Sequence, residues 1–238
     1  MTRILESIRG WNRDFTLLAI AVFSVGIFFG VQLTIYNNFI VDRLAIEPNE
    51  LGLVEALREV PGLLNAFIIA LMVGIPAPLF AGISLILMGG GLMAYVAVDT
   101  VYLLALFSVT WSIGFHCWVP LQQTMALQFS PGGAKGRWLG QLRAVNSVGW
   151  LLAIGLCLVL YRFIGYNGLF IIAGVVTMGG GVAVLFASRK RTDGELAFVF
   201  RRRYFVYYLL QFLQGCRKQM FITFAIFALV KVHGMPVT

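Results

Sequence analysis

The sequence predicts an all-α polytopic membrane protein with seven transmembrane helices, and three observations lead to this prediction. The chain is 60% hydrophobic and only 12% charged over 238 residues, whereas soluble domains are about 45–50% apolar and about 25% charged. The apolar residues gather in seven long runs. The basic residues gather at the N-terminus and in two of the gaps between those runs. Lipid is therefore the expected solvent for most of the chain.

Each run is long enough to be a transmembrane helix, since about 20 apolar residues cross roughly 30 Å of hydrocarbon. The expected helices cover about 15–40, 52–73, 79–98, 101–127, 140–162, 167–187 and 204–232. Turn-forming residues separate them, namely Pro76 and Pro78 after the second run, 130–133 after the fourth and 165–168 after the fifth. Unbroken runs of this length indicate helices, because barrel strands would be shorter and would alternate.

The basic residues predict which side of the membrane each gap faces. They are Arg3, Arg9 and Arg13 before the first run, Lys135, Arg137 and Arg143 around the fourth gap, and 189–191 with 201–203 in the sixth gap. Such residues stay on the cytoplasmic side, so we expect an inner-membrane protein with a cytoplasmic N-terminus. The net charge of +8 does not indicate nucleic acid, because these cations flank apolar runs and match anionic lipid headgroups.

An internal repeat relates the first three runs to the next three. Met88-Gly89-Gly90-Gly91 recurs ninety residues later at 178–181, and the same offset carries the first run onto the fourth and the second onto the fifth. Three helices repeated in the opposite orientation are typical of secondary transporters. The Gly-rich segments are expected to allow close helix packing. The sequence thus predicts a 3+3 inverted repeat in the first six helices.

A local motif carries a resemblance to a known family. Gly136-Arg137-Trp138-Leu139-Gly140, followed by Arg143, is expected to be a cytoplasmic loop motif, and it resembles the basic, Gly-spaced entry to the fifth helix of major facilitator superfamily transporters. The resemblance implies a six-helix bundle over 1–187, a basic cytoplasmic linker over 188–203, and the first helix of a second bundle over 204–238. It also implies a truncated chain whose C-terminal half is missing. The residues at 74–82 depart from the family, because they hold no acid and no base where its Gly-x-x-x-Asp-Arg-x-Gly-Arg loop would fall.

Polar residues inside apolar runs are the candidate site, because they are costly in lipid and tend to mark transport pathways. The candidates are Gln32, Tyr36 and Asn37 in run one, His116 and Gln122 in run four, and Gln211, Gln214, Arg217 and Lys218 in run seven. The resemblance implies that these three helices line a central cavity. The alternative for run seven is a helix that begins near Met220, with Arg217 and Lys218 at the membrane interface. Amide and aromatic side chains suit a neutral or weakly polar solute, and His116 could bind a coupling proton.

A cluster of charges opens the second run. Glu55, Arg58 and Glu59 share one helix face. We expect a solvated ion pair at the mouth of the helix, with an extracellular gate as the alternative. Cys117, Cys157 and Cys216 lie in three different runs without metal-ligand spacing, and are expected to be buried free thiols.

These observations favour a secondary active transporter that moves a small solute by alternating access. Its expected partners are the lipid bilayer, the solute and a coupling proton. The sequence shows no HExxH, GxSxG or phosphate-loop motif, so neither an enzyme nor a cofactor or metal is expected. A seven-helix receptor or retinal-type protein and a membrane-embedded transferase remain as alternatives.

Overall fold

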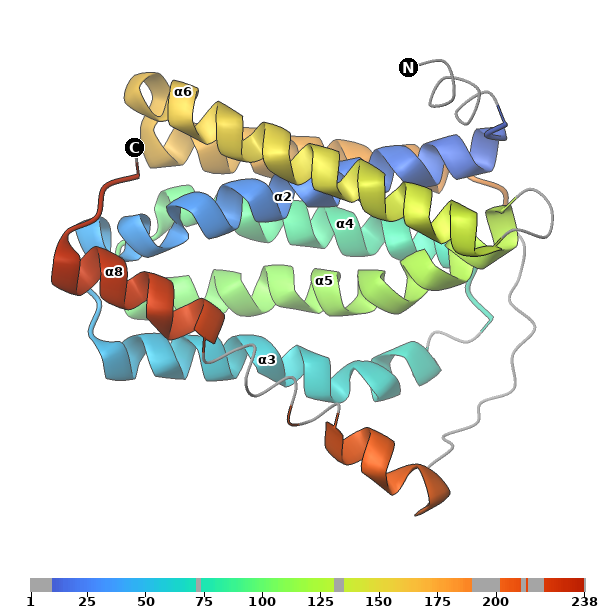
Figure 1. Ribbon diagram of the computed structural model, residues 1–238, viewed down its shortest axis with the longest axis horizontal. Helices are drawn as coiled ribbons and strands as arrows, with labels where there is room; N and C mark the ends of the chain where they lie inside the picture. The colour runs from blue at the N-terminus through green and yellow to red at the C-terminus, as the bar shows by residue number, and fades with distance from the viewer. Residues whose placement is uncertain are drawn as a thin grey trace.

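The chain forms a bundle of long antiparallel helices in the computed structural model, which describes residues 10–71, 74–130, 135–189, 202–210, 213 and 221–237 (Figure 1). The helices are α2 (Arg13–Leu44), α3 (Pro48–Leu71), α4 (Ala77–Met93), α5 (Val101–Phe129), α6 (Lys135–Leu185) and α8 (Ile226–His233). Three short helical turns accompany them, η1 (Ala94–Ala97), η2 (Arg202–Tyr204) and η3 (Phe221–Ala225). Within these ranges all regular structure is helical, which confirms the predicted all-α class.

Capping side chains set where the first two helices begin. The Asn12 side chain accepts the N–H of Phe15 at 2.8 Å and so starts α2. In α3 the Glu50 carboxylate accepts the backbone N–H of Glu47 at 2.9 Å, and Pro48 occupies the first helical position, where its missing N–H costs nothing. This local chemistry starts α3 at Pro48, ahead of the predicted residue 52.

Helix α6 contains two of the predicted spans. Only Gly165 has non-helical dihedral angles inside it, with φ 59° and ψ −164°. A positive φ is open to glycine because it has no Cβ. The chain therefore turns at Gly165, within the turn predicted at 165–168, and we refer to the parts on either side as the first and second halves of α6.

The first half of α6 begins earlier than the sequence suggested. It starts at Lys135 and not at 140, so the predicted cytoplasmic loop motif lies on a helix and its assignment to a loop was wrong. The motif residues placed on the helix are Gly136, Arg137, Gly140 and Arg143. The physical reason is Trp138, which is buried and packs edge-to-face on Phe15 at 5.1 Å between ring centroids. This contact holds the first turns of α6 against the bundle.

Among the residues that the structure describes, four helices are long and apolar enough to cross a membrane: α2, α4 with η1, α5 and α6. The 24-residue α3 is long enough to cross as well, but it carries Glu50, Glu55, Arg58 and Glu59. Of the seventh predicted run, the structure describes 204–210, 213 and 221–232, which include η3 and most of α8. Large apolar side chains such as Leu63, Tyr102 and Phe163 are exposed on the outside of the bundle, as expected of a surface that meets lipid.

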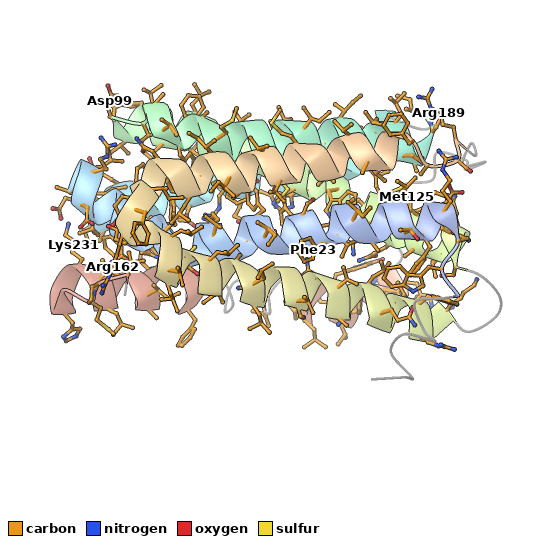
Figure 2. The ribbon with its side chains drawn as sticks, turned by 90° about the horizontal axis from the view of Figure 1, so that it is seen from above. Phe23, Asp99, Met125, Arg162, Arg189 and Lys231 are labelled. Atoms are coloured by element: carbon orange, nitrogen blue, oxygen red, sulfur yellow. The ribbon has the colours of Figure 1, made fainter. Side chains whose placement is uncertain are left out.

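The two ends of the bundle differ in which charged residues they carry. Figure 2 shows Asp99, Arg162 and Lys231 together at one end and Arg189 at the other, with Phe23 between them. We call the first end the Glu47 end, because α2 ends and α3 begins there, and the second the Lys135 end, because α6 begins there.

Glycines let α2 lie close to its neighbours in the centre of the bundle (Figure 1). A Cβ added at Gly26 would lie 2.3 Å from the backbone oxygen of Asn146 in the first half of α6. The repeated Met-Gly-Gly-Gly segments also pack closely, as predicted. A Cβ at Gly89 would lie 2.5 Å from the oxygen of Gly174, and one at Gly174 would lie 2.7 Å from the oxygen of Gly89. Backbones therefore touch where α4 packs on the second half of α6.

The pattern of contacts follows the predicted inverted repeat. Ser24 of α2 meets Gly180 in the second half of α6, and Gly114 of α5, ninety residues after Ser24, meets Ser84 of α4. In the same way α2 packs on the first half of α6 while α5 packs on α3, where Gly62 meets His116. Each of these contacts made by a helix of the first repeat thus has a counterpart made by the equivalent helix of the second repeat, as an inverted repeat requires.

Candidate functional site

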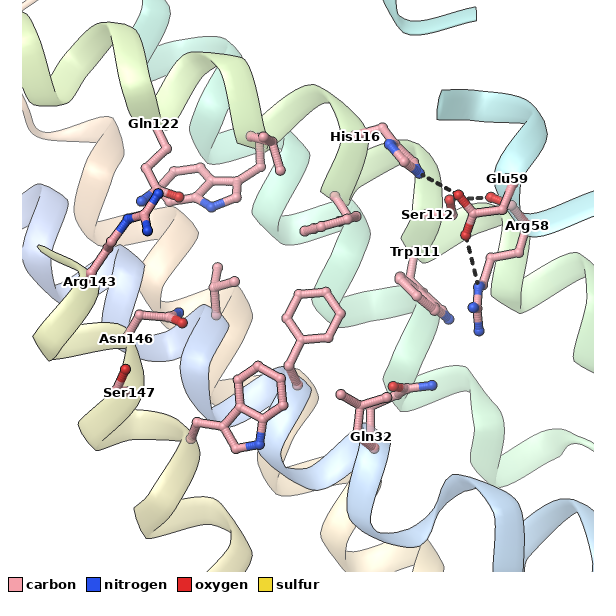
Figure 3. Close-up of a pocket in the computed structure, with 17 residues that line it drawn as sticks. Gln32, Arg58, Glu59, Trp111, Ser112, His116, Gln122, Arg143, Asn146 and Ser147 are labelled. Atoms are coloured by element: carbon pink, nitrogen blue, oxygen red, sulfur yellow. Dashed lines mark hydrogen bonds and ion pairs between the residues drawn. The ribbon is translucent and has the colours of Figure 1, made fainter. Parts of the chain in front are cut away.

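A cavity of about 510 Å³ lies between α2, α3, α5 and the first half of α6 (Figure 3). Its polar lining residues are Gln32, Arg58, Glu59, Ser112, His116, Gln122, Arg143, Asn146 and Ser147. Its aromatic lining residues are Phe29, Trp111, Phe115, Trp118 and Trp150. A volume of this size suits a small molecule, and a few polar groups among aromatic walls are typical of such sites.

A buried ion pair lies beside the cavity. Arg58 donates from both terminal nitrogens to the two carboxylate oxygens of Glu55, with Nη1 2.6 Å from Oε1. Only 6% of Glu55 is exposed, and it also accepts hydrogen bonds from Thr223 at 3.1 Å and from Tyr36 at 3.5 Å. The prediction of a solvated pair was therefore wrong. The cause is tertiary packing, because α2 and η3 cover this face of α3.

Arg58 connects this pair to the cavity wall. Its guanidinium lies over the ring of Trp111, 5.3 Å from the centroid, in a cation–π arrangement. Its Nε is 3.7 Å from Glu59, and the other Glu59 oxygen is 3.7 Å from Nε2 of His116. Figure 3 shows these side chains gathered at one end of the cavity. We call Arg58, Glu59 and His116 the charged end.

Aromatic rings form the middle of the cavity. Phe29 of α2 packs edge-to-face on Phe115 of α5 at 4.9 Å and lies parallel to Trp150 of α6 at 6.2 Å. Trp111 is held in place because its Nε1 donates to the hydroxyl of Tyr95 at 2.9 Å. The resulting wall is apolar, and it offers ring faces to a bound molecule.

Hydrogen-bond donors gather at the opposite end, formed by α5 and the first half of α6 (Figure 3). This donor end consists of Gln122, Arg143, Asn146 and Ser147. Asn146 is oriented by a bond from its Nδ2 to the backbone oxygen of Val22, at 3.1 Å. A second cavity of about 310 Å³ shares Gln122 and Arg143 and continues past Leu127 and Leu139 toward the Lys135 end.

The segment 221–237 is tied to the Glu47 end of the bundle. Lys231 donates to the Glu47 carboxylate at 2.9 Å and to the backbone oxygen of Ile46 at 2.6 Å. Asn38 donates to the backbone oxygen of Met235 at 2.9 Å. These contacts and the hydrogen bond between Thr223 and Glu55 lie near the charged end of the cavity. The second cavity instead extends from the donor end toward the Lys135 end of the bundle.

The structure places the sequence candidates in three groups. Gln32, His116 and Gln122 line the cavity. Tyr36 and Asn37 are buried in the bundle and are not among the lining residues, although Tyr36 contacts Glu55. Gln211, Gln214, Arg217 and Lys218 lie outside the described residues, as does Cys216. The other cysteines, Cys117 and Cys157, are buried free thiols as predicted.

Several lining residues escaped the sequence interpretation. Arg143, Asn146, Ser147 and Trp150 follow i, i+3, i+4, i+7 spacing, so they form one face of the first half of α6. That spacing was the signal which could have identified them. No set of three metal-ligating side chains is found among the residues that the structure describes.

Comparison with known proteins gives the family. The chain matches the model of the Major Facilitator Superfamily over residues 18–238. No curated protein matches it. Members of this family are membrane transporters and not enzymes. The match covers nearly the whole chain and agrees with the helical bundle and its cavity, so this protein belongs to the Major Facilitator Superfamily.

Proposed function

We propose that this protein is a secondary active transporter that moves a small solute across the cytoplasmic membrane by alternating access through the cavity of α2, α3, α5 and α6. The observation that carries the proposal is the cavity itself. It combines polar side chains with aromatic walls near the middle of α2, α5 and the first half of α6, which are long and apolar enough to cross a membrane. Ionisable side chains inside membrane-spanning bundles tend to mark the pathways of substrates and ions. The major facilitator match supports the same class.

The proposed orientation places the Lys135 end in the cytoplasm. Arg13, Lys135 and Arg189 lie at this end, and the positive-inside rule favours the cytoplasm for it. The second cavity then leads toward the cytoplasm, and the contacts of 221–237 lie on the outer side. The proposed domains are the bundle 1–187, the linker 188–203 and a helix of a second bundle over 204–238. A tag at the N-terminus that proves accessible from outside would contradict this orientation.

Cysteine labelling tests the cavity. With Cys117, Cys157 and Cys216 replaced by alanine, Ser147→Cys should react with a membrane-impermeant maleimide at least about tenfold faster than Val159→Cys, since thiolates form in water and not in lipid. Ser147 lines the cavity, whereas Val159 is an exposed residue of the same helix that does not line it. Reaction should be faster with the reagent on the cytoplasmic side. Equal protection of both cysteines would contradict a water-filled pathway.

We also propose that a proton drives the transport. The supporting observation is the His116–Glu59 pair, which lines the cavity with Arg58 as its other charged neighbour. Histidine changes charge between pH 5 and 8. Gain or loss of a proton at His116 would therefore change the electrostatic potential inside the cavity where the solute binds. Counterflow in reconstituted vesicles should vary several-fold across this range in the wild type and stay nearly flat in His116→Gln. If the pH profile of His116→Gln is the same as that of the wild type, the coupling proton binds at another residue.

A further inference from the structure

We infer that the solute carried by this cavity is an amphipathic organic anion, with its acidic group at Arg143, its apolar ring against Phe29 and Trp150, and a hydrogen-bond donor directed at Glu59. The inference rests on the proposed transport function and names the class of its substrate. It replaces the neutral or weakly polar solute that the sequence favoured.

The donor end fits an acidic group. Arg143 points into the cavity near Gln122 (Figure 3), and a guanidinium carries five N–H donors and no acceptor. No carboxylate lines the cavity at this end within the described part of the chain. A planar guanidinium binds carboxylates through paired hydrogen bonds, which gives it both charge and geometry for this ligand.

An orphan donor supports the same ligand. The indole Nε1 of Trp118 is buried and has no hydrogen-bond acceptor among the described residues. Trp118 lines the cavity one helical turn before Gln122. Buried polar groups are nearly always paired in native proteins. An acidic ligand between α5 and α6 would bring acceptor oxygens to the part of the wall where this donor lies.

The charged end has the opposite preference. Arg58 is already neutralised by the buried Glu55 carboxylate, so the net charge that remains at this end while His116 is neutral is that of Glu59. The Glu59 side chain is 44% exposed, and a carboxylate accepts hydrogen bonds. This end therefore favours a hydroxyl or amine of the solute and disfavours a second acidic group.

The spacing of the two ends sets the size of the molecule. His116 and Gln122 are six residues apart on α5 and mark the charged and donor ends. At 1.5 Å per residue they are separated by about 9 Å along the helix. The rings of Phe29, Phe115 and Trp150 line the same cavity. A six-membered ring with short arms at both sides fills this length.

Calorimetric titration of the purified protein in nanodiscs of phosphatidylcholine tests the assignment. The probes are 4-hydroxyphenylacetate, the matching neutral 4-hydroxyphenylacetamide, phenylacetate without the hydroxyl, and the cation tyramine. We expect the wild type to bind 4-hydroxyphenylacetate about tenfold more tightly than the amide, because hydrogen bonds to charged groups are about twice as strong as neutral ones. Phenylacetate should bind several-fold more weakly, and tyramine most weakly of all.

Matched variants locate the effect. Arg143→Gln should abolish the preference for the acid over the amide, because binding of the acid should weaken much more than binding of the amide, and Arg143→Lys should keep part of the preference. Arg162→Gln is the control, since Arg162 is an exposed arginine of the same helix half that does not line the cavity. An unchanged preference in Arg143→Gln would overturn the inference, as would a wild type that prefers tyramine.

Two further outcomes separate the remaining explanations. If the wild type binds none of the probes at millimolar concentration while Ser147→Cys is labelled as expected, the substrate class is wrong and the proposed transport function stands. Repeating the titrations with phosphatidylglycerol in the nanodiscs tests whether a lipid headgroup occupies Arg143. The inference would be overturned if the probes no longer bind in nanodiscs with phosphatidylglycerol and this lipid raises the melting temperature of the wild type but not of Arg143→Gln. Arg143 would then bind a lipid headgroup.

Discussion

Replacing Glu55 with glutamine should lower the stability of the protein by about 3 kcal/mol, because removing one partner of a buried ion pair leaves the other charge unpaired. Arg58 would keep its charge in a place where only 12% of its side chain is exposed. The hydrogen bond from Thr223 would lose its charged acceptor as well. The measurement is the melting temperature in detergent, which should fall by several degrees.

Two further variants make this result specific. Glu59→Gln changes the other carboxylate near Arg58. The Glu59 side chain is 44% exposed, and its Oε1 is 3.7 Å from Nε of Arg58, so this substitution should lower the free energy of unfolding by less than about 1 kcal/mol. The double variant Glu55→Gln/Arg58→Met removes both charges and should recover most of the lost stability. If the double variant is as unstable as the single one, the loss does not come from an unpaired charge.

Gly26→Ala should be the most damaging small substitution in the bundle. The added methyl group would lie 2.3 Å from the backbone oxygen of Asn146 and 3.1 Å from the backbone nitrogen of Trp150. Backbone atoms cannot swing away as a side chain can, so α2 and α6 must separate. Overpacking typically costs 1–3 kcal/mol, and we expect about 3 kcal/mol here. Since both helices line the cavity, solute binding should weaken as well.

Gly155→Ala is the matched control for this prediction. Gly155 lies on the same first half of α6, but a Cβ there would have no heavy atom within 4 Å. Alanine is the better helix former, so stability should stay the same or rise slightly. The readout is the yield of monodisperse protein together with its melting temperature. Equal behaviour of Gly26→Ala and Gly155→Ala would show that the helices have room to adjust.

The order of the helices could be predicted from the sequence because a bilayer restricts the choices. A span must be long, apolar and helical, and these conditions are visible without knowledge of tertiary contacts. The break at Gly165 and the repeated Met-Gly-Gly-Gly segments were visible for the same reason, since glycine has a local meaning in a helix. The resemblance to the major facilitator superfamily depended on the motif at Gly136, and the family match over residues 18–238 shows the membership.

The site was harder to predict because its members meet only in three dimensions. Glu55 and Arg58 suggested a local surface pair, yet one partner of Glu55 is Thr223, which is 168 residues away. Arg143 was assigned to a loop because basic residues and glycines near the end of a span indicate a membrane interface. The structure continues α6 through this stretch, and Arg143 lines the cavity. Neither outcome could be derived from neighbours in the sequence.

The turn at Gly165 has a consequence for movement within the bundle. A single residue with positive φ joins the two halves of α6, and consecutive Cα atoms are only about 3.8 Å apart. The two halves therefore stay joined at this point, and any change in the angle between them turns on the dihedral angles of Gly165.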